Sequence, residues 1–288
     1  MTGLPQLRDA RDARLEVARE QFFDAGLIPE EGVPDRILRS WSRCREGGLD
    51  HATSRIVDPA GRALLAESRE RSASLLEQAS GVMEHVFEQI RSSGSMVILA
   101  DLDGMIIHSL GDASFVDRAE RVSLQPGACW SEPLRGTNGV GTALLDRAPI
   151  EVLGGEHYLD SNMFLACCAS PIFDAHGKLA GVLDISGDYR NPQRHTLGLV
   201  RLSVQLLEKR LFESQFAREI IIAFHARPEY LGSLQEGLIA VSADGELVGA
   251  NPAAREWLAS LSVGGEAPCF SDLFKLSLGA ILDRAASA

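Results

Sequence analysis

Residues 165–186 read LACCASPIFDAHGKLAGVLDIS, two apolar runs on either side of a polar turn at 174–177. This pattern predicts a β-hairpin. Further towards the N-terminus, two apolar runs at 96–100 and 105–109 enclose an Asp-Gly turn, and another strand is expected at 149–153. Segments with helical spacing surround these strands. We therefore predict an α+β domain with a central antiparallel sheet flanked by helices.

The period of two along a strand decides which side chains of the 165–186 hairpin share a face. Cys167 and Cys168 are adjacent, so they should point to opposite faces and cannot readily share a metal ion. Both are expected to be small buried hydrophobic side chains. Asp184 and Ser186 should share one face. A buried Asp is unfavourable unless it is paired, so Asp184 meets a partner, faces solvent or contacts a ligand.

Between the strands lies the glycine-rich stretch 130–144, WSEPLRGTNGVGTAL. It lacks the lysine of a phosphate-binding loop and the spacing of a dinucleotide fingerprint, so a phosphate site is not expected. Gly136 and Gly139 permit a tight loop before a helix at 140–145, and Thr137 or Asn138 can cap that helix. A polar loop at a helix N-terminus is also suited to a small oxygenated ligand.

Helical periodicity dominates both ends of the chain. Two amphipathic helices are expected before residue 50, and Asp58-Pro59 is a start signal for a helix that runs to about residue 91. A sustained helix is predicted from Pro192 to Phe224. Its apolar residues step by three and four, which favours a homodimer seam, although a helix that buries one stripe in its own domain looks much the same. The seam residues are Leu197, Val200, Val204, Leu207 and Leu211.

The composition indicates a globular protein without an evident nucleic-acid surface. Lys and Arg total 28 against 40 Asp and Glu, for a formal charge of -12, and no basic patch offsets it. The five cysteines lack CxxC spacing, so neither a disulfide framework nor a zinc site is indicated. No signal-peptide core and no membrane-length apolar run are present. We expect a cytoplasmic protein with no cofactor, no metal site and no membrane contact.

Several short strings together resemble the GAF domain of sigma-54-dependent transcription activators of the acetoin-catabolism regulator group, with the dihydroxyacetone-operon regulators as near relatives. They are WSE at 130–132, GTNGVGTAL at 136–144, GEHY at 155–158, CASPI at 168–172 and GVLDIS at 181–186. Residues 237–258 are similar to the opening of a PAS domain, and the segment after Trp257 is too short for a complete one. The resemblance implies an N-terminal helical segment at 1–58, a GAF sensory domain at 59–212, a relay helix or linker at 213–227 and a partial PAS-like domain at 228–288.

The resemblance also implies a function. Such regulators continue into an AAA+ ATPase and a helix-turn-helix domain, and this sequence has no GxxxxGK[ST] loop, so we expect it to be the sensory part of a longer regulator. It should bind a small oxygenated effector such as an acetoin-like hydroxyketone, a diol or an alcohol. The missing domains would contact DNA and sigma-54 RNA polymerase. The candidate ligand-binding residues are Trp130, Glu132, Thr137, Asn138, His157, Tyr158, Phe164, Cys167, Asp184 and Ser186.

No catalytic residues are predicted. The sequence has no GxSxG elbow, HExxH helix or papain-like cysteine motif, so an enzyme is not expected. Two alternatives remain open. One is a thiol-dependent reductase built on a GAF-like fold, with Cys129 or Cys168 as the reactive thiol, and the other is a dimerisation scaffold that binds no ligand.

Overall fold

The computed structural model describes residues 4–53, 62–191, 193–260 and 269–286. The chain divides into two compact units. The first comprises Met1–Ile172 and Leu179–Val204, and the second Phe173–Lys178 and Gln205–Ala288. The helix start predicted at Asp58-Pro59 lies outside the described residues.

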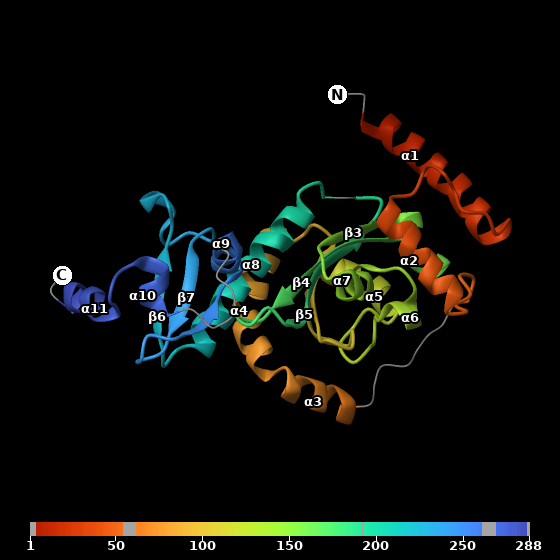
Figure 1. Cartoon of the computed structure of the whole chain (residues 1–288). Helices are drawn as coiled ribbons and strands as arrows, with labels where there is room; N and C mark the ends of the chain where they lie inside the picture. Colours follow the sequence, from red (N-terminus) through yellow and green to blue (C-terminus); the bar gives the residue numbers. More distant parts are fainter. Residues whose placement is uncertain (1–3, 54–61, 192, 261–268, 287–288) are drawn as a thin grey trace. The chain divides into compact units, whose positions relative to one another are not determined.

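The first unit is a five-stranded sheet with helices on both faces (Figure 1). The strand order is β2-β1-β5-β4-β3, and the pairs β1–β2, β1–β5 and β3–β4 are antiparallel. The strands are β1 (Ser95–Ala100), β2 (Ile106–Gly111), β3 (Ile150–Leu153), β4 (Leu165–Phe173) and β5 (Leu179–Asp188). The α+β class and both predicted hairpins are thereby confirmed, because period-two alternation and tight Asp/Gly turns are strong local signals.

The helices of this unit are α1 (Leu4–Arg19), α2 (Asp35–Glu46), α3 (Arg62–Arg71), α4 (Ala73–Ile90), α5 (Ala113–Glu120), α6 (Glu132–Arg135) and α7 (Gly139–Asp146). Short turns of helix are η1 (Glu20–Asp24), η2 (Gly154–Glu156) and η3 (Asp160–Asn162). The single helix predicted up to residue 91 is interrupted at Ser72, which separates α3 from α4.

The two faces of the sheet carry different layers. Helix α4 contacts β1 and β2, whereas α7 contacts β3 and β5, and α5 contacts β1. The core on the α7 side includes Ile98 from β1, Val152 from β3 and Cys167 from β4, together with Leu15 and Trp41 from the N-terminal helices. Helices α1 and α2 thus complete the hydrophobic core of the sheet, because their apolar stripes are buried against it.

The second unit has a three-stranded sheet in the order β6-β7-β8. Its elements are the C-terminal half of α8 (Thr196–Gln215), β6 (Ile220–Phe224), η4 (Pro228–Tyr230), β7 (Gly237–Val241), β8 (Leu247–Ala250), α9 (Pro252–Ser260), α10 (Phe270–Phe274) and α11 (Leu278–Ala286). The strand, turn, strand and helix predicted at 237–258 are confirmed.

The predicted continuation of the long helix to Phe224 is wrong. Helix α8 ends at Gln215, and Ile220–Phe224 is strand β6, paired with β7 from Ile220 opposite Val241 to Phe224 opposite Gly237. Three consecutive isoleucines favour an extended strand, because β-branched side chains pack well on a pleated surface. The residues at 216–224 matched the helical spacing only loosely, and pairing with β7 overrides that match.

Candidate functional site

The candidate site lies where the start of α7 meets the inner face of β4 and β5. Asn138 caps α7, its Oδ1 accepting from the Gly141 N–H at 2.8 Å and its Nδ2 donating to the Gly136 carbonyl at 2.8 Å. Gly139, the first residue of α7, packs so closely on the sheet that a Cβ there would lie 2.6 Å from Asp184 Oδ1 and 2.9 Å from Cys167 Cβ. Asn138 therefore caps the helix, as predicted, and Gly139 allows the helix to pack closely on the sheet.

Four of the ten predicted ligand-binding residues form a continuous buried cluster, which we call the polar cluster: Asp184, Ser186, Cys167 and His157. The Ser186 hydroxyl donates to Asp184 Oδ2 at 2.6 Å and lies 3.1 Å from Cys167 Sγ. His157 Nε2 is 3.3 Å from the same sulfur, and His157 Nδ1 is 3.0 Å from the Gly154 carbonyl. Because a carbonyl only accepts, the neutral ring carries its proton on Nδ1, and Nε2 accepts from the thiol.

One atom of the polar cluster has no partner. Asp184 is 1% exposed, and its Oδ1 has no hydrogen-bond partner among the described residues, whereas its Oδ2 accepts from Ser186. Buried polar atoms are nearly always hydrogen-bonded, so an orphaned carboxyl oxygen requires an explanation. It faces the start of α7, as the close approach to Gly139 shows.

Burial sets the charge of the cluster. Loss of hydration raises the pKa of Asp184 to about 7, and hydrogen bonding from Ser186 only partly opposes this. Burial lowers the pKa of His157 to about 4, so the imidazole is neutral near pH 7. Burial and the nearby Asp184 raise the pKa of Cys167 well above its ordinary value. Near pH 7 the cluster thus combines a neutral imidazole, a protonated thiol and a carboxyl group close to its titration midpoint, all of which can form hydrogen bonds.

Glu132 is buried, and other residues of the protein hold its carboxylate. It is 2% exposed and accepts two hydrogen bonds from the Arg43 guanidinium, from Nε to Oε1 at 2.7 Å and from Nη2 to Oε2 at 2.9 Å. The hydroxyls of Ser40 and Thr142 also donate to Oε2, at 2.5 and 3.0 Å. With both oxygens occupied, Glu132 ties α2 to α6 and α7. Sequence reasoning missed Ser40, which lies on the buried face of α2 between Ile37 and Trp41, and the half-buried Arg43 on the same helix.

The other predicted residues are also engaged by the protein. Trp130 Nε1 donates to the Ser123 carbonyl at 3.0 Å, and Thr137 Oγ1 lies 2.6 Å from Ser40 Oγ. The Tyr158 hydroxyl donates to the Leu49 carbonyl at 2.7 Å. Phe164 is half-buried against the core beneath the Arg118 guanidinium, 4.9 Å from the ring centroid. These side chains shape the surroundings of the polar cluster without an oxygen or nitrogen turned towards it in the described contacts.

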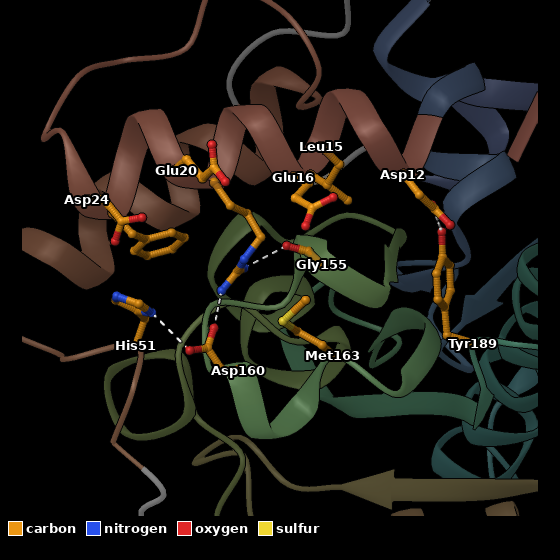
Figure 2. A pocket seen from close by; sticks show the side chains of 12 residues that line it. Asp12, Leu15, Glu16, Glu20, Asp24, His51, Gly155, Asp160, Met163 and Tyr189 are labelled. Carbon is orange, nitrogen blue, oxygen red and sulfur yellow. Dashed lines mark hydrogen bonds and ion pairs between the residues drawn. The ribbon is translucent and has the colours of Figure 1, made fainter. Parts of the chain in front are cut away.

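The loop Gly154–Asn162, which carries His157, is covered from outside by α1 and η1. Figure 2 shows α1 above this loop, with Gly155 and Asp160 turned towards the helix and His51 joined to Asp160. An open groove of about 520 Å³ lies between them, and none of the predicted ligand residues lines it. The contact between α1 and this loop could not be predicted from local patterns, because it joins residues more than 130 positions apart.

Neither buried cysteine of β4 has the character of a reactive thiol. Cys168 lies on the face opposite Cys167, as predicted, with its sulfur 3.7 Å from Glu151. Burial, followed by the charge of Glu151, raises the pKa of Cys168. A thiol that holds its proton is a poor nucleophile, so these surroundings do not favour the reductase alternative at Cys168. Among the described residues, no group of three His, Cys, Asp or Glu side chains is arranged to hold a metal ion.

The predicted seam of α8 is largely buried within the single chain. Val200, Val204, Leu207 and Leu211 are 0 to 8% exposed, and Leu197 is half-buried. The exposed apolar side chain of this helix is Leu202, at 57%. The homodimer stays a prediction, and its interface would have to use residues other than these buried ones. In the part of the chain described, no helix is long and apolar enough to span a membrane.

The fold is that of a GAF-like domain, and comparisons with known proteins show the family to which the chain belongs. The N-terminal region of DhaR from Escherichia coli, solved in complex with DhaL, superposes with a TM-score of 0.62 at 19% identity, over 88% of this chain and 85% of that one, which shows the fold. The family described as "MimR, N-terminal domain" matches residues 10–203. The chain belongs to this family.

Curated relatives are regulators of operon transcription. The acetoin catabolism regulatory protein of Cupriavidus necator is 30% identical over 240 residues, 80% of this chain and 36% of that protein. The acetoin dehydrogenase operon transcriptional activator AcoR of Bacillus subtilis is 28% identical, over 70% of this chain and 33% of its own length. The propane 2-monooxygenase operon transcriptional activator MimR of Mycolicibacterium goodii is 32% identical, over 59% of this chain and 28% of that protein. The chain thus spans about a third of these relatives.

Proposed function

We propose that this chain is the signal-receiving region of a bacterial sigma-54-dependent transcription activator, and that the polar cluster binds its effector. The effector is a short oxygenated molecule, namely an acetoin-like hydroxyketone, a diol or an alcohol. The family and the regulatory relatives support the first part. Two relatives are named for acetoin and a third for dihydroxyacetone, both short carbon chains with neighbouring oxygens.

The observation that carries the proposal is the unpaired Oδ1 of Asp184. A ligand hydroxyl can donate to this oxygen when the carboxyl is ionised, and a ligand carbonyl can accept from it when the carboxyl is protonated. With its pKa raised to about 7, Asp184 can take either form near neutral pH. His157, Cys167 and Ser186 supply adjacent polar atoms for a second oxygen. A hydroxyketone offers both kinds of oxygen on neighbouring carbons.

The surroundings limit the size of the effector. Trp130, Val140 and Cys167 belong to the same packed core as the sheet, and Gly139 approaches Asp184 closely. A ligand must displace packed groups to reach Oδ1, so a molecule of a few carbons is favoured over a larger one. Signal transfer to an ATPase, and contacts with DNA and sigma-54 RNA polymerase, are proposed for other parts of the longer protein. A ligand shifts that signal only by its preference for one state of the sensory region.

Isothermal titration with acetoin, 2,3-butanediol, dihydroxyacetone and 2-propanol tests the proposal. At least one should bind the parent chain saturably, and Asp184→Ala and Cys167→Ala should weaken it by about tenfold to a hundredfold, the effect of losing one or two buried hydrogen-bonding partners. Cys168→Ala is the matched control, since it makes the same truncation one position away on the opposite face. Absence of saturable binding, or equal losses in the two cysteine variants, contradicts the proposal.

A further inference from the structure

Arg19, the last residue of α1, is buried against the loop Gly154–Asn162 with only 9% exposure. Its Nη1 donates to the carbonyls of Gly155 and His157, each at 2.7 Å. Its Nη2 forms an ion pair with Asp160 and lies 3.4 Å from the Tyr158 carbonyl. One guanidinium thus serves three main-chain oxygens and a carboxylate within six residues of the loop.

This arrangement suits arginine in particular. Main-chain carbonyls that are removed from water need donors, and the curled backbone of the loop leaves several of them pointing outward. The planar guanidinium presents its donors in a fixed fork, whereas lysine offers a single nitrogen. The Arg19 fork also lies over the Phe23 ring, 4.6 Å from its centroid, which restricts its orientation.

His157 connects this contact to the polar cluster. Its carbonyl accepts from Arg19 on the outer side of the loop, and its imidazole meets Cys167 and the Gly154 carbonyl on the inner side. The main chain at His157 is held at its carbonyl from the helix side and at its N–H by the Gly154 carbonyl, at 3.1 Å. The direction of the ring follows from both contacts. Loss of the outer contact would release the main-chain position from which the ring reaches the sulfur.

We propose that Arg19 is a positioning residue for the effector site, which acts through His157 by fixing the loop Gly154–Asn162 from outside. This inference rests on the proposed effector site. It assigns to the helix before the GAF-like sheet an indirect part in ligand recognition, because α1 contributes no residue to the polar cluster and acts through the loop.

The loop has other attachments, so the loss of Arg19 should change it locally. Arg11 Nη2 pairs with Glu156 Oε1 at 2.6 Å, and Trp41 Nε1 donates to the Glu156 carbonyl at 2.8 Å. The Tyr158 hydroxyl donates to the Leu49 carbonyl. None of these contacts is made to the His157 carbonyl, which accepts from Arg19.

The first test needs no effector and follows the imidazole of His157 by NMR. In the parent chain its pKa should be about 4, because burial excludes the charged form. Arg19→Ala should raise this pKa by about one unit or more, as the ring gains access to water. The positive charge of Arg19 also lowers the His157 pKa, so Arg19→Lys, which keeps the charge but not the fork, separates the two causes. A rise in both variants supports positioning, and a rise in the Ala variant alone overturns it.

The second test measures effector affinity by titration in a double-mutant cycle. Arg19→Ala and His157→Ala should each weaken binding by about tenfold, and the double variant should bind no more weakly than His157→Ala, because one residue acts through the other. Arg14→Ala is the control, since Arg14 is exposed on the same helix and donates to the Ala10 carbonyl. Additive losses overturn the inference. If Arg19→Ala does not fold, Arg19→Lys takes its place in the cycle. If the parent chain binds no effector, the result contradicts the proposed function and not the role of Arg19.

Discussion

Replacement of Asp184 by Asn should make the first unit more stable, by an amount that grows with pH. In the folded chain the pKa of Asp184 is about 7, against an ordinary value of 3.8. The folded state therefore holds a proton that the unfolded state has lost between these two pH values, so unfolding free energy falls as pH rises. At 1.36 kcal/mol per pKa unit, the three-unit difference corresponds to about 4 kcal/mol.

His157 acts in the opposite sense and has to be separated. Its folded pKa of about 4 lies below the ordinary 6.5, so the unfolded state binds the extra proton and stability rises with pH across that interval. In the parent chain the two effects largely offset each other from pH 4 to 6.5. The difference between Asp184→Asn and the parent removes the His157 contribution, because both proteins contain it. That difference should increase by up to about 4 kcal/mol between pH 4 and pH 7.5.

Urea unfolding followed by tryptophan fluorescence measures this difference. A Trp257→Phe background leaves Trp41 and Trp130, both buried in the first unit, as reporters. Asp188→Asn on the same strand is the control, since Arg118 and the Arg190 N–H lower the pKa of Asp188 to about 2, and its loss should destabilise by a constant amount from pH 5 to 7.5. A pH-independent gain for Asp184→Asn, or a loss, would refute the reasoning.

Three further predictions concern packing and assembly. Glu132→Gln should lower the unfolding free energy by about 1 to 3 kcal/mol, because the neutral amide weakens the hydrogen bonds from Arg43, Ser40 and Thr142, although Arg43 keeps its ion pair with Asp146. Urea unfolding measures this loss, and an unchanged unfolding free energy would mean that Glu132 is not a structural link. Asn138→Ala should lower it by about 1 to 2 kcal/mol through loss of the α7 cap, with a thermal shift as the measurement and an unshifted melting temperature as the opposing result. Light scattering should show a homodimer that Leu202→Asp converts to a monomer, whereas a monomeric parent over a wide concentration range contradicts the dimer.

The sheet could be predicted because its signals are local. The hairpin at 165–186 is fixed by alternation and by its turn, so the shared face of Asp184 and Ser186 also followed, and their hydroxyl–carboxylate contact confirms it. Strand β6 could not be predicted in the same way. The apolar residues Phe216, Ile220, Ile221 and Phe224 match a helix stripe loosely, and pairing with β7 decides in favour of a strand.

The candidate site was less accessible to sequence reasoning, because its arrangement depends on distant contacts. Glu132 beside Trp130 suggested a ligand contact, yet Arg43, 89 residues earlier, occupies both of its oxygens. Asn138 was a candidate for both capping and binding, and the structure shows the cap. The proposed role of Arg19 depends on carbonyls in a loop about 140 residues away. Every residue has a main-chain carbonyl, so residue identity does not show which carbonyls accept from a distant side chain.

The central claim is that an oxygen of the effector forms a hydrogen bond with the unpaired Oδ1 of Asp184. A crystal structure of the chain grown with the tightest-binding of acetoin, 2,3-butanediol, dihydroxyacetone and 2-propanol tests it most directly. We predict a ligand oxygen within hydrogen-bonding distance of Asp184 Oδ1 and a second polar contact from His157, Cys167 or Ser186. Ligand density in another place, with Asp184 Oδ1 still unpaired beside Gly139, would contradict the account.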